Sequence, residues 1–121
     1  MIKGVHAMFY SSEAEALREL LRDKLGFVAN ATGGGWLIFD APETEIGCHP
    51  TDHESSLPSG THDISFYCSD LDATVHALKE RGVRFVGEPK DVGYGQAIRF
   101  EVPGGFTLEL YEPLYEQPRL S

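Results

Sequence analysis

The stretch "CSDLDATVHALKERGVRF" (Cys68–Phe85) decides the fold, because it reads as a helix with a signal at each end. Ser69 followed by Asp72 is typical of a helix start, since a hydroxyl and an acid three residues later satisfy two free amide donors. Gly82 suits the residue just after a helix. The apolar residues between recur at helical spacing: Leu71, Val75 and Leu78. We therefore predict a helix at about residues 70–81.

An earlier stretch, "SSEAEALRELLRDKLGF" (residues 11–27), repeats this pattern. Ser12 followed by Glu15 is again a capping signal, leucines recur at helical spacing, and Gly26 ends the run. A second helix is predicted at about residues 13–25. The chain therefore contains an internal repeat.

Each predicted helix lies between predicted strands. "GVHAMFYS" and "DISFYCS" precede the helices, and three short strand candidates follow each one. Those candidates are residues 27–31, 36–39 and 45–49 in the first half, and 84–86, 96–102 and 106–111 in the second. The prediction is an α+β fold: two βαβββ modules form one domain, with a cleft lined by curved mixed sheets.

The domain organisation follows from these elements. Module one spans 2–50 and module two spans 62–113, with a tail at 114–121. Residues 51–61 are polar and broken by proline and glycine, which is typical of a linker. Each module is too small to fold comfortably alone, so we expect one shared core.

Composition excludes several classes of partner. The net charge of −9 argues against nucleic acid and anionic membranes. No apolar run approaches the roughly 20 residues that a membrane span needs, and the start of the sequence lacks a signal-peptide pattern. Cys48 and Cys68 both fall on strand faces that look buried, which suits a reduced, cytoplasmic protein.

Strand alternation predicts which side chains face the cleft. In "DISFYCS" the apolar set Ile64, Phe66 and Cys68 should meet the helices, which leaves Asp63, Ser65 and Tyr67 for the cleft. The repeat offset of 57 residues makes His6 equivalent to Asp63. In "GGFTLELYEP" the same alternation turns Glu109 and Tyr111 to the cleft. A carboxylate there must be solvated, paired or bound to a metal.

These features together resemble the vicinal oxygen chelate superfamily, which includes glyoxalase I, extradiol dioxygenases and bleomycin-resistance proteins. The resemblance covers residues 2–113 and rests on "VHAMFYSSEAEALRELLRDKLGF", "HDISFYCSDLDATVHALKERGVRF" and "PGGFTLELYEP". It implies a divalent metal in the cleft, with His6 and Glu109 as ligands and Glu109 as the candidate catalytic residue. Members of the family are commonly dimers, so a homodimer is expected.

The remaining ligands stay open. The family's second histidine falls at Asp63 by alternation, and His62 serves only if a bulge turns it inward. The fourth position is Gly47, which has no side chain to offer. The bleomycin-resistance branch binds its drug without a catalytic metal.

Two functions are therefore predicted as alternatives. One is a lyase, isomerase or dioxygenase that uses Mn, Fe, Ni or Zn on a small oxygenated substrate. The other is a metal-free protein that binds or sequesters a small molecule. A module that binds a protein partner would leave His6 and Glu109 without a role.

A substrate pocket is predicted from side chains on the cleft side of the strands and their loops. Arg99 either meets an anionic substrate or pairs with Glu101, and the loop around Tyr94 is either a mobile flap or an ordinary hairpin turn. The predicted pocket residues are Met8, Tyr10, Trp36, His49, Tyr67, Tyr94, Arg99 and Tyr111.

Overall fold

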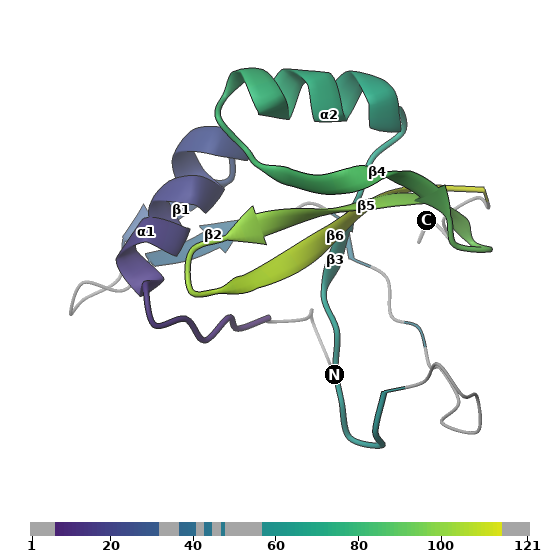
Figure 1. Ribbon diagram of the computed structural model, residues 1–121. Coiled ribbons are helices and arrows are strands. Elements are labelled where there is room, and N and C mark those ends of the chain that lie inside the picture. Colours follow the sequence, from purple (N-terminus) through teal and green to yellow (C-terminus); the bar gives the residue numbers. More distant parts are fainter. Residues whose placement is uncertain (1–6, 32–36, 41–42, 45–46, 48–56, 115–121) are drawn as a thin grey trace.

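A computed structural model describes residues 7–31, 37–40, 43–44, 47 and 57–114 of the chain (Figure 1). Within them, each of the two helical segments is followed by strands, as the predicted modules require. The elements in chain order are α1 (Ala14–Glu19), η1 (Leu20–Lys24), β1 (Val28–Ala31), β2 (Leu37–Asp40), β3 (Ser65–Tyr67), α2 (Leu71–Glu80), β4 (Phe85–Asp91), β5 (Gly95–Val102) and β6 (Phe106–Pro113).

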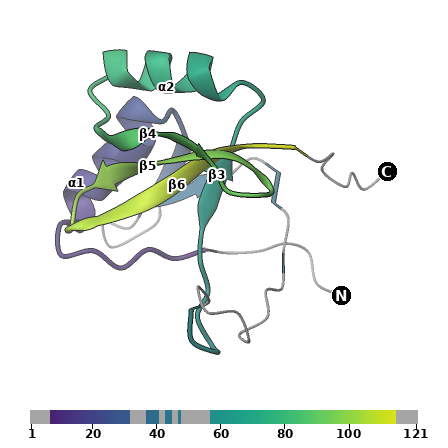
Figure 2. The same cartoon turned by 45° about the vertical axis from the view of Figure 1, so that its right-hand side comes forward.

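The larger sheet has four strands in the order β3-β6-β5-β4. β4–β5 and β5–β6 are antiparallel pairs, whereas β3 lies parallel to β6, so the sheet is mixed. β1 and β2 form a separate antiparallel pair. The predicted α+β class with a curved mixed sheet is confirmed, and Figure 2 shows the twist of the four strands.

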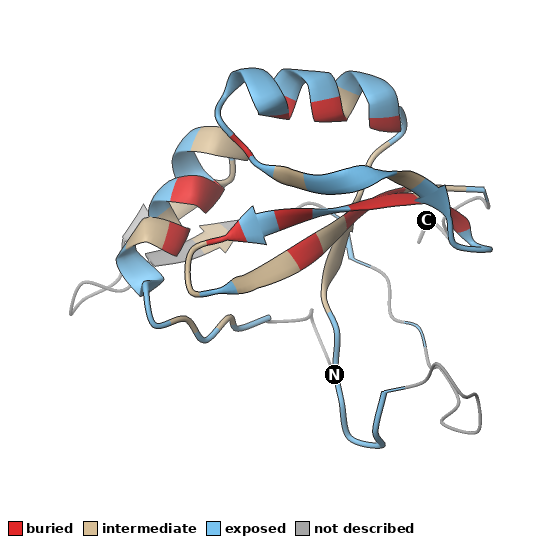
Figure 3. Cartoon of the chain, viewed as in Figure 1, coloured by how far each residue is buried: buried red, intermediate tan, exposed pale blue. Residues whose placement is uncertain are grey.

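One face of this sheet is covered by the helices, and the core lies between them (Figure 3). The burial of β5 alternates: Ile98, Phe100 and Val102 are buried, whereas Arg99 and Glu101 are exposed. The core also takes apolar residues from both helical segments and from β6: Leu17, Leu20, Leu21, Leu71, Val75, Leu78, Leu108 and Leu110. Burying each such side chain contributes about 1.5–3 kcal/mol, and this apolar face is therefore what holds the helices on the sheet.

Both predicted helices are present. The first is shorter in its regular part, since α1 passes into the π-helical turn η1 after Glu19. Gly26 and Gly82 follow the two helical segments with φ values of 81° and 89°. Only glycine adopts this conformation without strain, so the predicted helix ends are confirmed.

The predicted N-caps were wrong by one residue. α2 is capped by Asp70, whose carboxylate accepts a hydrogen bond from the Ala73 amide at 3.1 Å, and not by Ser69. The N-cap of α1 is Glu13 rather than Ser12, and Glu13 makes no side-chain capping bond. In both Ser12-Glu13 and Ser69-Asp70, the second residue occupies the N-cap position. The sequence pattern alone does not determine which of two adjacent polar residues takes that position.

The second module matches its prediction strand for strand, and the first does so in part. Residues 7–10 form no strand, although "GVHAMFYS" was predicted to be one. A strand needs a partner for its backbone groups, and alternating apolar residues do not supply one. Residues 45–46 of the last predicted strand in module one lie outside the described residues, and so do residues 51–56 of the linker. The module boundaries and the internal symmetry stay predictions.

Several contacts join the two halves of the chain. The Ser11 hydroxyl donates to the carbonyl of Pro103 at 2.7 Å, and the Gly104 amide donates to Glu13 at 3.0 Å. The rings of Phe27 and Phe66 meet edge to face at 5.3 Å. The first helical segment therefore shares one core with the second module, as expected for halves too small to fold alone.

Candidate functional site

The face of the four-stranded sheet that no described helix covers carries a row of polar side chains with Glu109 in the middle. Glu109 on β6 lies opposite Ser65 of β3 and Arg99 of β5 in the strand register. Residues that face one another across neighbouring strands project from the same side. The alternation argument that placed Ser65, Tyr67, Glu109 and Tyr111 on one face therefore agrees with the register. We call this surface the open face.

Glu109 is hydrogen-bonded by a tyrosine from the β4–β5 turn. The hydroxyl of Tyr94 donates to Oε2 of Glu109 at 2.7 Å. The pKa of Tyr94 is raised well above its ordinary value, first because burial disfavours the phenolate and second because Glu109 holds the proton. Tyr94 is therefore a neutral hydrogen-bond donor at physiological pH.

Three tyrosine rings lie together beside Glu109. Tyr94 meets Tyr111 edge to face at 5.2 Å, and Tyr67 meets Tyr111 at 6.0 Å with tilted planes. Tyr111 is only 7% exposed although it lies on the open face, whereas Tyr94 is 44% exposed. Tyr94 and Tyr67 therefore contribute to covering Tyr111, and they form an aromatic wall next to the carboxylate.

The β4–β5 turn holds Tyr94 in this position through its backbone. The Val92 amide donates to the Gly95 carbonyl at 2.9 Å, and the Gly93 amide donates to the Asp91 side chain at 2.8 Å. A side chain at Gly95 would collide with the backbone carbonyl of Glu112, so glycine is needed for the close approach of β5 and β6. Of the two sequence readings of this loop, the described geometry matches the ordinary hairpin turn.

Arg99 does not pair with Glu101, which was one of the two partners that the sequence suggested. Its Nε donates to the Thr107 hydroxyl at 2.8 Å, and its Nη2 donates to the Thr107 carbonyl at 2.9 Å. Thr107 lies diagonally across from Arg99 on β6, within easy reach of a long side chain. The guanidinium is thus bound to a neutral residue on the open face.

The structure brings together only part of the predicted site. Glu109, Tyr94, Tyr111 and Tyr67 are adjacent, whereas Tyr10 is 89% exposed on a segment without strand structure. His62 and Asp63 are exposed and precede the start of β3. Asp63 is near enough to add to the electrostatic environment of Tyr94. Met8 is also exposed, and its pocket role and that of Tyr10 stay predictions.

The structure describes only some of the predicted metal ligands and pocket residues. His6, Trp36 and His49 lie outside the described residues. Among the residues that are described, no three His, Cys, Asp or Glu side chains come together as a metal would require. The described part of Glu109's surroundings therefore does not by itself make a metal site.

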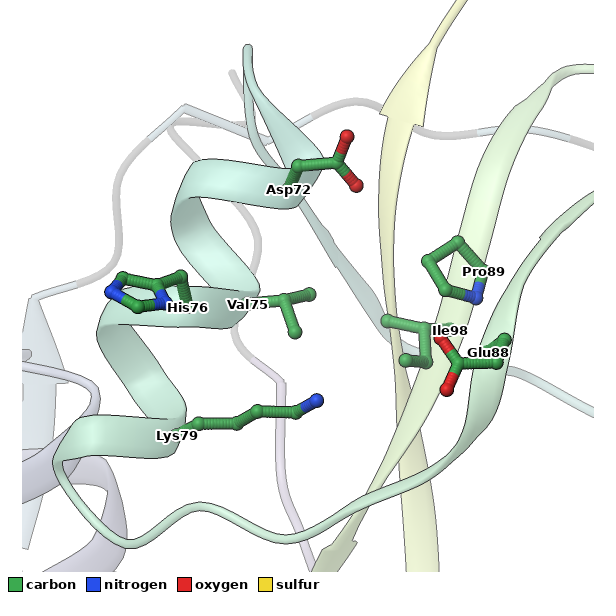
Figure 4. Close-up of a pocket in the computed structure, with 7 residues that line it drawn as sticks. All are labelled: Asp72, Val75, His76, Lys79, Glu88, Pro89 and Ile98. Atoms are coloured by element: carbon green, nitrogen blue, oxygen red, sulfur yellow. The ribbon is translucent and has the colours of Figure 1, made fainter.

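A hollow that the sequence did not suggest lies on the other side of the sheet (Figure 4). Val75 and Lys79 extend from α2 toward Ile98 and Glu88, and the space between has a volume of about 210 Å³. This is below the roughly 300 Å³ typical of ligand pockets. Beside this hollow, the pairing of β4 with β5 has an irregular register between Val86 and Lys90. Pro89 is the residue of the sequence that indicates this irregularity, since proline within a strand is typical of an edge or a bulge. The lining residues are Asp72, Val75, His76, Lys79, Glu88, Pro89 and Ile98.

None of the helices in the described part of the chain is both long enough and apolar enough to cross a membrane.

Comparison with known proteins places the chain in a family. Residues 4–110 match the Glyoxalase/Bleomycin resistance protein/Dioxygenase superfamily. The protein YetH of Bacillus subtilis strain 168 is 26% identical over 121 residues, covering 93% of this chain and 100% of YetH.

Solved structures agree with this match. TnmS3, an antibiotic binding protein from Streptomyces sp. CB03234, is 25% identical with a TM-score of 0.60, covering 93% of this chain and 99% of TnmS3. A superfamily member from Sphaerobacter thermophilus DSM 20745 is 25% identical with a TM-score of 0.59, covering 91% of this chain and 97% of that one. The chain therefore belongs to the glyoxalase/bleomycin resistance/dioxygenase superfamily, the vicinal oxygen chelate proteins.

Proposed function

We propose that this chain binds a small organic molecule on the open face, as a binding or sequestering protein of the bleomycin-resistance type. The observation that carries the proposal is the grouping of Tyr67, Tyr94 and Tyr111 around the Glu109 carboxylate. Aromatic surface with a few convergent polar groups is the usual composition of a ligand site. Tyrosine supplies both a flat apolar face and a polar end.

The likeness to TnmS3 supports the same function. That protein is described as antibiotic binding, and it aligns with nearly the whole of this chain at 25% identity. Binding alone needs no catalytic group, so the loss of side-chain chemistry at Gly47 does not count against it.

The proposal is tested by nuclear magnetic resonance on the ¹⁵N-labelled full chain, titrated with 2-phenylethanol and then with larger hydroxylated aromatic compounds. Amide shifts should concentrate on β3, β6 and the Tyr94 turn. Tyr67→Ala should weaken binding, whereas Glu88→Ala on the opposite side of the sheet should leave it unchanged. Shifts confined to α2 and β4 would place binding in the smaller hollow and contradict the proposal.

A metal-dependent lyase, isomerase or dioxygenase is the second candidate. It is favoured by Glu109, because Tyr94 takes only Oε2 and no described residue donates to Oε1. Glu109 and His6 would hold the metal with Asp63 or an inward-turned His62. A bound divalent ion would supply a Lewis acid for two adjacent oxygens of a substrate.

Calorimetric titration decides on the metal. Apo protein without a histidine tag is titrated with Mn²⁺, Fe²⁺, Ni²⁺ and Zn²⁺, and the titration is repeated on Glu109→Ala and His6→Ala. A metal enzyme requires binding by the parent protein and its loss in both variants. Equal binding by parent and variants would remove this candidate.

The proposal also includes a cytoplasmic homodimer. The Cys68 thiol is free, which fits a reducing compartment. The open face is shallow on a single chain, and a second copy would deepen it. Light scattering at several protein concentrations tests the dimer directly.

A further inference from the structure

We propose that the ligand of the open face carries a protonated amine beside a flat apolar ring, with Glu109 as the counter-ion and the tyrosines as the aromatic wall. This inference rests on the proposed function and adds the chemical class of the ligand.

The Glu109 carboxylate has one oxygen available. The Tyr94 hydroxyl donates to Oε2, and no described residue donates to Oε1. A carboxylate accepts hydrogen bonds on both oxygens, and it prefers charged donors, which bind about twice as strongly as neutral ones. A protonated amine is a small-molecule group that satisfies both preferences.

The charges on the open face leave Glu109 without a positive partner among the described residues. Arg99 stands opposite Glu109 in the register, but its guanidinium donates to Thr107. The charges of Asp63 and Arg99 act on Tyr94 with opposite signs, and the effect of Asp63 is the larger of the two. With a net charge of −9, the chain attracts cations and repels anions at long range.

The rings complete the recognition. A cation within about 6 Å of a tyrosine ring is attracted by its negative face. Tyr94 keeps its proton at physiological pH, because burial and the bond to Glu109 raise its pKa. Tyr94 therefore presents a neutral ring beside Tyr67, with Tyr111 packed beneath them, and the adjacent Glu109 carboxylate supplies the full negative charge. An anionic ligand would meet Arg99, whose guanidinium already donates to Thr107, and would be repelled by Glu109.

A matched pair of probes tests the ligand class on the full chain. 2-Phenylethylamine and 2-phenylethanol share the ring and the linker and differ in their charge. Titration followed by ¹⁵N amide shifts should show the amine binding about tenfold more tightly, given the usual strength of charge-assisted bonds and cation–π contacts. In Glu109→Gln the amine should bind no better than the alcohol.

Glu101→Gln is the control, since it removes one negative charge from the same face at a position in register with Thr107. The amine preference should survive in it. Equal affinities for the two probes in the parent protein would overturn the ligand class while leaving binding at the open face intact. A preference that persists in Glu109→Gln would also overturn it, and the absence of any shift with either probe would reject the proposed function together with it.

Discussion

The two faces of the four-stranded sheet are built from alternate residues of the same strands, yet they have opposite compositions. On β5 the residues toward the helices are Ile98, Phe100 and Val102, and those on the open face include Arg99 and Glu101. The first set is apolar and buried, so it contributes to stability. The second set is polar and only partly covered, so it is available for recognition. This contrast predicts that substitutions on one face change folding and those on the other change binding.

The largest effect is expected at the centre of the helix-covered face. Phe100 is 1% exposed, stacks on Phe66 and packs against Phe85 with tilted ring planes. Phe100→Ala should lower the free energy of unfolding by about 3–5 kcal/mol, because it removes a large buried ring and leaves a cavity. Urea unfolding measures this. Glu101→Ala, one residue away on the other face, should change stability by about 0.5 kcal/mol or less, and a similar loss in both would refute the contrast between the faces.

The next largest loss of stability is expected at Gly95, where the backbones of β5 and β6 come close together. Gly95→Ala places a methyl group against the Glu112 carbonyl, so β5 and β6 must separate locally. We expect a loss of about 1–3 kcal/mol, as for other overpacked sites, together with a shift of the Tyr94 ring. Gly47→Ala is the control, because nothing described lies within 4 Å of a methyl group there. Thermal unfolding compares the two, and unchanged stability in Gly95→Ala would mean that the strands are not as close as described.

A smaller effect is expected at the start of α2, which covers the apolar face. Asp70→Ala removes the acceptor for the Ala73 amide, so it should cost about 1 kcal/mol. Ser69→Ala should cost much less, since Asp70 and not Ser69 is the cap. Chemical unfolding of both variants measures the difference. A larger loss in Ser69→Ala than in Asp70→Ala would show that Ser69 is the N-cap, as the sequence pattern suggested.

The smallest effect on stability is expected on the open face, at Tyr94. Its folded-state pKa lies above its ordinary value of 10.0, chiefly through burial and then through Glu109. The stability from this interaction is therefore complete below pH 10 and is lost as the pH rises through the folded-state pKa. Tyr94→Phe should remove that part of the alkaline destabilisation, and Glu109→Gln should lower the pKa of Tyr94. Ultraviolet titration of the phenols checks both, and an unchanged titration in Glu109→Gln would show that the hydrogen bond is absent in solution.

Much of the second module was predictable because its signals are local. Helix spacing, the glycine stop at Gly82 and the alternation in "GGFTLELYEP" each depend on neighbours within a few residues, and all agree with the structure. The strand predicted at residues 4–11 was not confirmed at residues 7–10, because strand formation depends on a distant partner that composition does not name. The cap at Asp70 was missed for a similar reason, since two adjacent residues had the right chemistry.

The candidate site shows the same division. Alternation alone predicted that Tyr67, Glu109 and Tyr111 share a face, and the register agrees. The hydrogen bond from Tyr94 to Glu109 was not predictable, because it joins a turn to a strand 15 residues later in the chain. Of the two partners considered for Arg99, Glu101 is not bonded to it, and Thr107 was not foreseen because it comes within reach only through the pairing of β5 with β6.

The sequence by itself determined the family, the α+β class, the ends of the helices at glycine and the side of the sheet to which each residue of β5 and β6 belongs. These properties follow from short-range sterics and from the two-residue period of a strand. The tertiary structure alone decided which side chains meet on the open face: that Tyr94 donates to Glu109, that Arg99 turns to Thr107, and that Tyr111 is covered although it lies on that face. Such contacts depend on strand order and register, which arise only when segments far apart in the chain pack together.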